Sequence, residues 1–351
     1  MQKSNDARIR AVERLPTPHS LKEKYPLTDG ALRTVATTRR AIGRILHGAD
    51  SRLLVVVGPC SIHDPKRVFW YAKGLAKLAV RLKDQLLIVL RFCGDKPRTG
   101  KAWTGYWSDP HMDGSCDFAA GWMESRKLAA EILDLGLPLG CEFLDAAHYQ
   151  NIDDAISHAW LGARDVGSQS MRKLASGLSV PVGFKNNNVA GVRLALDAMS
   201  VARESNTFVS SNDMGQLCSF TSMGNRLAHL IHRGTDAGPN YDPESISDSV
   251  HQLQDRGFLA RIVIDASHGN SRKDHRKQAG VIEDVVGQVM AGSHYIAGIM
   301  YESYLKEGSQ SIPEDLKTLI PGVSVTDGCD SWETTERVLR EVHSRLSGRP
   351  R

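Results

Sequence analysis

The stretch LLVVVGPCSIHD, residues 53–64, joins five consecutive apolar residues to a polar turn that carries thiol, imidazole and carboxylate groups. An apolar, β-branched run of this length is typical of a strand buried on both faces of a parallel sheet. The same order of apolar run, polar turn and helical pattern recurs along the chain. The runs are Leu53 to Val57, Leu86 to Phe92, Leu139 to Phe143, Leu161 to Val166, Val180 to Phe184, Thr207 to Ser210, Arg261 to Asp265 and Tyr295 to Met300. Eight strands that alternate with helices favour a closed (β/α)8 TIM barrel of the α/β class over an open sheet.

Two segments fall outside this repeating pattern. Residues 1–50 precede the first predicted strand and include a helix-like stretch from Thr28 to Leu46. We therefore expect an N-terminal extension over residues 1–50 and a barrel over residues 51–351. The interval from Ser211 to Leu259 is too long for a plain loop between strand and helix, so we expect an elaborated loop after strand six.

The composition of the chain excludes several classes of protein. Apolar residues make up 41% and charged residues 24% of the 351 residues, as in a soluble globular protein with a large core. The formal net charge of +4 comes from scattered basic residues, which argues against a nucleic-acid partner. No run is long and apolar enough for a membrane span, and Met1 to Arg14 lacks the apolar core of a signal peptide. The six cysteines form no CxxC pair, so we expect a cytoplasmic protein without a disulfide framework.

Unusual polar residues follow the predicted strands at their carboxyl ends, where barrel enzymes place their chemistry. Five of these residues are cations, Arg91, Lys96, Arg98, Arg164 and Lys185, and Arg233 from the long interval after strand six is a candidate sixth. A single cation at such a position is usually solvated or salt-bridged. A set of cations that converges on one mouth is costly unless anions neutralise it, so the set predicts a site for phosphate or carboxylate groups.

A second set combines a thiol, an imidazole and carboxylates: Cys60, His268, Glu302 and Asp327. Such a mixture suits a divalent transition metal. A buried cysteine or a histidine at a strand end is more often structural, and the wide spacing of this set leaves both interpretations open.

Five motifs together make this sequence resemble a known family. They are GPCSIHD at 58–64, KPRT at 96–99, GFKN at 183–186, the DxSHxNS pattern at 265–271, and Glu302-Ser303. The chain is similar to type I 3-deoxy-D-arabino-heptulosonate 7-phosphate synthases of the microbial, aromatic-amino-acid-regulated branch. The similarity extends from about Arg8 to Arg340 and includes the extension and the closing segment Thr326 to Trp332.

The resemblance implies a fold, a reaction and a set of roles. Its fold is the barrel already predicted, and its reaction condenses phosphoenolpyruvate with erythrose 4-phosphate and releases phosphate, the entry step of the shikimate pathway. It implies a divalent metal (Mn2+, Fe2+, Co2+ or Zn2+) on Cys60, His268, Glu302 and Asp327, with Lys96, His268 and Cys60 as catalytic residues. Phosphoenolpyruvate would bind Arg91, Lys96, Glu142, Ala163 (main chain), Arg164, Lys185 and Arg233, and the aldose phosphate would bind Arg98 and Thr99.

The resemblance also implies regulation and assembly. In the family, such extensions pack on a neighbouring subunit and help to form an effector pocket, so we expect a homodimer or homotetramer. Residues that match the pocket pattern for an aromatic amino acid are Gln150, Ser179, Phe208 and Ser210.

The chain departs from the family pattern at three places. Asp165-Val166-Gly167 stands where Thr-Thr-Glu is expected, Cys93-Gly94-Asp95 replaces an aromatic-rich Tyr-Phe-Glu, and Asp213 stands in place of a lysine. We expect these changes to lie at the site mouth and to bear on the identity of the aldehyde. The alternatives are a sister synthase that uses arabinose 5-phosphate, the same chemistry on another aldose phosphate, and a non-catalytic, metabolite-sensing paralogue.

Overall fold

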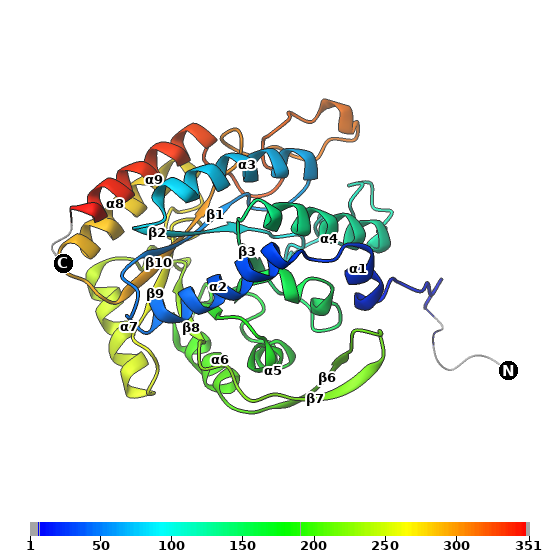
Figure 1. Cartoon of the computed structure of the whole chain (residues 1–351), viewed down its shortest axis with the longest axis horizontal. Helices are drawn as coiled ribbons and strands as arrows, with labels where there is room; N and C mark the ends of the chain where they lie inside the picture. Colours follow the sequence, from blue (N-terminus) through cyan, green and yellow to red (C-terminus); the bar gives the residue numbers. More distant parts are fainter. Residues whose placement is uncertain (1–5, 7, 190, 349–351) are drawn as a thin grey trace.

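A closed barrel of parallel strands forms the centre of the molecule. The computed structural model describes residue 6, residues 8–189 and residues 191–348. Around the ring the strands follow the order β1-β10-β9-β8-β5-β4-β3-β2, and helices cover the outside (Figure 1). The predicted (β/α)8 barrel is therefore confirmed.

The barrel strands are short and almost completely buried, as their apolar composition requires. They are β1 (Leu53–Gly58), β2 (Leu86–Arg91), β3 (Leu139–Glu142), β4 (Ile156–Leu161), β5 (Val182–Lys185), β8 (His229–His232), β9 (Ile262–Asp265) and β10 (Ile296–Glu302). The predicted runs for the first, second, third, fifth, seventh and eighth barrel strands overlap β1, β2, β3, β5, β9 and β10.

The predicted position of strand four was wrong. The run from Leu161 to Val166 meets the observed β4 only at Leu161. The reason is that β4 contains Ser157 and His158, which are fully buried but interrupt the apolar letters of the sequence.

The predicted strand six was also wrong, because it lies outside the barrel. The segment β6 (Thr207–Ser211) pairs antiparallel with β7 (Leu217–Thr221) in a separate two-stranded sheet. Side chains of β6 alternate between exposed and buried, as expected for a hairpin with one solvated face. The sixth barrel strand is β8, so the elaboration precedes the sixth strand instead of following it.

Five of the seven outer helices in the described part of the chain begin at a polar residue whose side chain caps the helix. At the start of α3 (Pro65–Leu82), the Asp64 carboxylate accepts a hydrogen bond from the Arg67 amide at 3.1 Å. The other outer helices are α4 (Phe118–Asp134), α5 (Gln169–Gly177), α6 (Arg193–Arg203), α7 (Pro243–Asp255), α8 (Gln278–Met290) and α9 (Trp332–Ser347). Short 3-10 turns include η1 (Tyr149–Asn151), η2 (Asp153–Ala155), η3 (His275–Lys277) and η4 (Leu316–Thr318). No helix in the part of the chain that the structure describes is long and apolar enough to cross a membrane.

The extension contributes two helices, α1 (Pro18–Lys24) and α2 (Asp29–Leu46). The predicted helix from Thr28 to Leu46 is confirmed as α2, with Thr28 as its N-cap. Ile42, Ile45 and Leu46 of α2 join the buried cluster inside the barrel. Helix α2 is therefore part of the barrel core, and the division into residues 1–50 and 51–351 stays a prediction.

Helix α1 lies beside the tip of the β6–β7 hairpin (Figure 1). The Lys22 ammonium is 2.8 Å from Asp213 and 3.3 Å from Asp153, and the His19 amide donates a hydrogen bond to the Asp213 carbonyl at 2.8 Å. The expectation that Asp213 lies at the site mouth was wrong, because this acid binds the extension.

Candidate active site

The charged side chains of the barrel mouth continue the inward-facing rows of the apolar core. An inner cluster contains Val89, Ile231, Val263 and Met300, which come from four different strands. Side chains alternate between the two faces of a strand, so the residue two positions later also points inward, closer to the carboxyl end. These later residues are Arg91, Arg233, Asp265 and Glu302.

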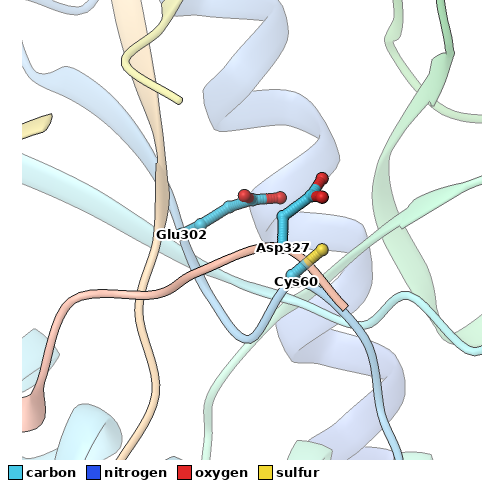
Figure 2. Close-up of side chains that lie close together, drawn as sticks. All are labelled: Cys60, Glu302 and Asp327. Carbon is cyan, nitrogen blue, oxygen red and sulfur yellow. The ribbon is translucent and has the colours of Figure 1, made fainter. Parts of the chain in front are cut away.

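Three of the four predicted metal ligands lie together at this mouth. Ligand atoms of Cys60, Glu302 and Asp327 all lie within 4.8 Å of one another, and their side chains point toward a common centre (Figure 2). Asp327 reaches this centre because the segment after β10 returns beside it, where Ser303 pairs with Asp330. A thiol and two carboxylates at this spacing fit a divalent transition metal.

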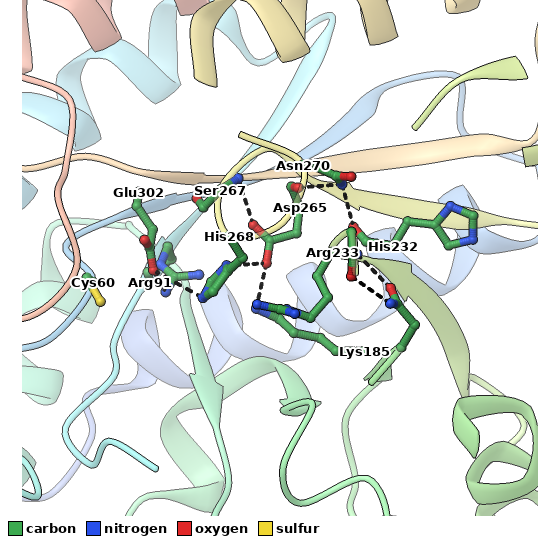
Figure 3. Close-up of polar contacts among 12 residues, drawn as sticks. Cys60, Arg91, Lys185, His232, Arg233, Asp265, Ser267, His268, Asn270 and Glu302 are labelled. Atoms are coloured by element: carbon green, nitrogen blue, oxygen red, sulfur yellow. Dashed lines mark hydrogen bonds and ion pairs between the residues drawn. The ribbon is translucent and has the colours of Figure 1, made fainter. Parts of the chain in front are cut away.

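The fourth predicted ligand, His268, lies next to this group. Its Nε2 is 4.0 Å from Glu302 Oε1, and its Nδ1 is 2.9 Å from Asp265 Oδ2 (Figure 3). A small cavity is lined by His268, Glu302 and Asp327 together. A carboxylate beside Nδ1 favours a proton on that nitrogen and leaves the Nε2 lone pair free for a ligand role.

The protonation of Cys60 depends on the charge around it. Burial, together with the Glu302 carboxylate, raises the pKa of the Cys60 thiol to about 12. The Lys96 ammonium lies 3.3 Å from Cys60 Sγ and donates a hydrogen bond to the Cys60 carbonyl at 3.0 Å. The thiolate form that a metal ligand requires therefore needs strong positive charge beside it.

Two buried cations form the floor of the predicted anion site. Arg91 donates to Glu302 Oε1 at 2.9 Å through Nη2, whereas its Nε and Nη1 are buried without a hydrogen-bond partner among the described residues. Lys185 lies 2.7 Å from Asp265 Oδ2. Unpartnered, buried guanidinium N–H groups are costly, and a phosphate or carboxylate would satisfy them.

The remaining predicted substrate residues surround these cations at different depths. Lys96, Glu142 and Arg233 are buried, Ala163 is half-buried, and Arg98, Thr99 and Arg164 are exposed. Arg164 Nε donates to Thr99 Oγ1 at 3.0 Å, which joins the loop after β2 to the loop after β4.

Asp165, one of the departures from the family pattern, lies close to Glu142. Burial and the Glu142 carboxylate raise the pKa of Asp165 to about 6, against a weaker lowering by Arg164. Its Oδ2 has no hydrogen-bond partner among the described residues. This acid therefore does lie at the mouth, as the sequence predicts.

The four predicted effector residues occupy the outer side of the barrel. Phe208 of β6 stacks on Phe220 of β7 at 5.8 Å between ring centroids. The Ser210 hydroxyl donates a hydrogen bond to the Ala146 carbonyl, which ties the hairpin to the segment that leads into η1. Gln150 in η1 is buried, and Ser179 is exposed in the loop before β5. Their shared role stays a prediction.

The sequence places Asp265 at a strand end, but no role is predicted for it. In the structure its Oδ2 contacts both Lys185 and His268, and its Oδ1 accepts a hydrogen bond from the Ser267 amide at 3.0 Å (Figure 3). The alternation of side chains along β9 could have revealed its position. Val263 points into the core, so Asp265, two residues later, also points into the barrel.

Comparisons with known proteins agree with this geometry. The sequence pattern of the DAHP synthetase I family matches residues 24–340. The chain is 43% identical over 350 residues to the Tyr-sensitive phospho-2-dehydro-3-deoxyheptonate aldolase of Salmonella typhimurium, covering 99% of this chain and 98% of the relative. It is 42% identical over 346 residues to the Phe-sensitive enzyme of Escherichia coli, with coverage of 99% and 98%.

A solved structure gives the same result. The phospho-2-dehydro-3-deoxyheptonate aldolase of Francisella tularensis SCHU S4 superposes with a TM-score of 0.95 at 37% identity, covering 98% of this chain and 100% of that one. The chain belongs to the DAHP synthetase I family.

Proposed function

We propose that this chain is a phospho-2-dehydro-3-deoxyheptonate aldolase, a transferase that condenses phosphoenolpyruvate with erythrose 4-phosphate and releases phosphate. The observation that carries the proposal is the meeting of a Cys60, Glu302 and Asp327 donor set with the unpartnered Arg91 guanidinium at one barrel mouth. The names of the relatives support the same reaction.

The donor set fits a divalent ion such as Mn2+, Fe2+, Co2+ or Zn2+, held by Cys60, His268, Glu302 and Asp327. Such an ion, when bound, supplies Lewis-acid polarisation of the aldehyde oxygen.

The protein's own residues bind and orient the substrates. Arg91, Lys185 and Arg233, with Arg164 and the Ala163 main chain at the rim, neutralise the phosphate and carboxylate of phosphoenolpyruvate and fix the approach of its C3. Glu142 lines the same pocket. Arg98 and Thr99 bind the aldose phosphate.

Lys96 is the proton donor of the proposed mechanism. Burial alone would lower the pKa of Lys96, but the neighbouring Cys60, Cys93, Glu142 and Glu302 raise it overall, so the ammonium form is retained. A retained ammonium can hydrogen-bond to the aldehyde oxygen and protonate it as the new carbon–carbon bond forms. Water then adds at C2, and phosphate leaves.

We also propose feedback control and assembly. An aromatic amino acid would bind near Gln150, Ser179, Phe208 and Ser210, in line with the Tyr-sensitive and Phe-sensitive names of the relatives. The enzyme would be a cytoplasmic homodimer or homotetramer.

A second candidate retains the phosphoenolpyruvate chemistry but uses another aldose phosphate. The observation that favours it is Asp165, a half-buried acid next to Glu142 at the mouth.

A phosphate-release assay with phosphoenolpyruvate and a panel of aldose phosphates tests both candidates. We expect erythrose 4-phosphate to give the highest kcat/KM. A higher value for a five-carbon aldose phosphate would favour the second candidate, and no release with any aldose phosphate would refute both.

A further inference from the structure

The largest fully buried side chain of the described residues, Trp160, lies directly beneath the anion site. It belongs to the inner cluster of the barrel and has no exposed surface. Its strand neighbours in register are Glu142 on β3 and Gly183 on β5. Trp160 is therefore level with Glu142 along the paired strands, next to the charged residues of the mouth.

The indole contacts both floor cations. The Arg91 guanidinium carbon lies 5.5 Å from the Trp160 ring centroid, and the Lys185 ammonium lies 6.0 Å from it. These distances fall within the range of attraction between a cation and the face of an aromatic ring. Arg91 and Lys185 have different carboxylate partners, Glu302 and Asp265, so the indole is a contact that the two cations share.

Ordinary core packing does not account well for an indole at this position. The Trp160 Nε1 is buried without a hydrogen-bond partner among the described residues, a cost that leucine, methionine or phenylalanine would not carry. The neighbouring strand also makes room for the ring, because a Cβ on Gly140 would lie 3.2 Å from Trp160 Cζ3. Contact between a large π surface and two cations would explain both the unpartnered indole nitrogen and the space left by Gly140.

We propose that Trp160 is a positioning residue that holds Arg91 and Lys185 side by side as one anion-binding pair. The negative ring face attracts both cations and offsets their mutual repulsion. Arg91 Nε and Nη1, which have no hydrogen-bond partner among the described residues, are then available to the anion. The proposal rests on the proposed use of phosphoenolpyruvate and adds a residue that does not itself touch the substrate.

The test compares three variants of the Mn2+-loaded protein. Trp160→Leu removes the ring face, Trp160→Phe keeps an aromatic face, and Val56→Ala opens space in the same inner cluster on β1. Calorimetric titration with phosphoenolpyruvate measures binding without turnover, and steady-state rates give KM for each substrate.

We expect Trp160→Leu to weaken phosphoenolpyruvate binding about tenfold, with kcat and the KM for erythrose 4-phosphate within about threefold of wild type. We expect Trp160→Phe and Val56→Ala to bind within about threefold of wild type. Unchanged binding by Trp160→Leu would overturn the proposal, as would an equal loss in Val56→Ala, which would indicate simple loosening of the core.

Tryptophan emission keeps the proposal testable if Trp160→Leu does not fold. We expect phosphoenolpyruvate to change the tryptophan emission of the wild type but not that of Trp160→Phe. Trp70→Phe is the control, because the Trp70 side chain is 71% exposed, and its emission should still change. An emission change that persists in Trp160→Phe would refute the shared contact. Wild-type protein that binds phosphoenolpyruvate but releases no phosphate with any aldose would refute the proposed function while leaving the role of Trp160 intact.

Discussion

Replacing Asp265 with asparagine tests how the mouth holds its charges. This carboxylate is fully buried and contacts Lys185 at 2.7 Å and His268 Nδ1 at 2.9 Å through the same oxygen. Surrounding cations hold the pKa of Asp265 well below its usual range, against the effect of burial. Asparagine keeps the shape but removes the negative charge, and its amide nitrogen can only donate.

The expected loss of stability is several kcal/mol. At 2.7 Å, with an effective dielectric constant of about 20, the attraction between Lys185 and Asp265 is about 6 kcal/mol before the cost of desolvating both groups. Removing one partner of a buried pair costs about 3–5 kcal/mol, because the other charge stays buried. We therefore expect Asp265→Asn to lower the free energy of unfolding by about 3 kcal/mol.

The same substitution should weaken metal binding. Asp265 favours the proton on His268 Nδ1, which leaves Nε2 free to act as a ligand. We expect Mn2+ affinity to fall by about 10-fold to 100-fold, the usual loss when a partner of a ligating histidine is removed.

Urea unfolding followed by circular dichroism and equilibrium dialysis with Mn2+ provide the two measurements. The double variant Lys185→Met with Asp265→Asn is the matched control. It should recover most of the lost stability, since no lone charge remains, but not phosphoenolpyruvate binding. If the free energy of unfolding of Asp265→Asn lies within about 0.5 kcal/mol of the wild-type value, the buried pair of Lys185 and Asp265 does not stabilise the fold.

Three further predictions concern the metal, the effector and a buried histidine. EDTA should abolish phosphate release and Mn2+ should restore it, while Cys60→Ala should lose metal affinity in dialysis yet keep its circular dichroism spectrum; unchanged affinity would contradict the ligand assignment. Phenylalanine, tyrosine or tryptophan should inhibit, and Phe208→Ala should lose that inhibition with its KM values unchanged; calorimetry that detects no binding of any of the three would end the effector hypothesis. Burial lowers the pKa of His229 from its usual 6.5 to about 4. The unfolded chain therefore takes up this proton first as pH falls, and stability should drop by up to about 3 kcal/mol between pH 6.5 and 4. His229→Gln should lose this part of the slope, whereas the exposed His251→Gln should retain it; equal slopes in the two variants would count against a buried, neutral His229.

How far the sequence predicts the fold depends on what each strand buries. Strands such as β1 and β10 face apolar neighbours on both sides, so their composition identifies them. Strand β4 places His158 inside the barrel, where its Nε2 lies 3.1 Å from His229 Nε2. Polar residues of this kind break the apolar run by which a buried strand is recognised in a sequence. Strand β8 is hidden for the same reason, because His229 and His232 begin and end it.

The sequence could place those site residues that lie at or directly after the end of a barrel strand. Cys60 and Glu302 are close to the ends of paired strands β1 and β10, so the strand-end rule brings them together. Asp327 depends on a long return of the chain after β10, fixed by contacts such as Ser61 Oγ to Thr326 Oγ1 at 2.8 Å. No local pattern encodes that return. The residue types alone made Asp327 one candidate ligand among others, and the resemblance to the family implied its metal role.

The balance of charge at the mouth gives a physical reason for the expected metal. Four cations are buried there, Arg91, Lys96, Lys185 and Arg233, and three carboxylates, Glu142, Asp265 and Glu302. Protein charges alone are therefore nearly balanced, and the exposed carboxylate of Asp327 balances them further. Phosphoenolpyruvate adds a carboxylate and a phosphate of about two negative charges, an excess that a mostly buried site tolerates poorly. A divalent ion beside Cys60 and Glu302 would offset part of that excess, even after Cys60 loses its proton to become a ligand. We therefore expect phosphoenolpyruvate to bind more tightly when Mn2+ is present, and equal affinity in EDTA would mean that the ion serves the aldehyde alone.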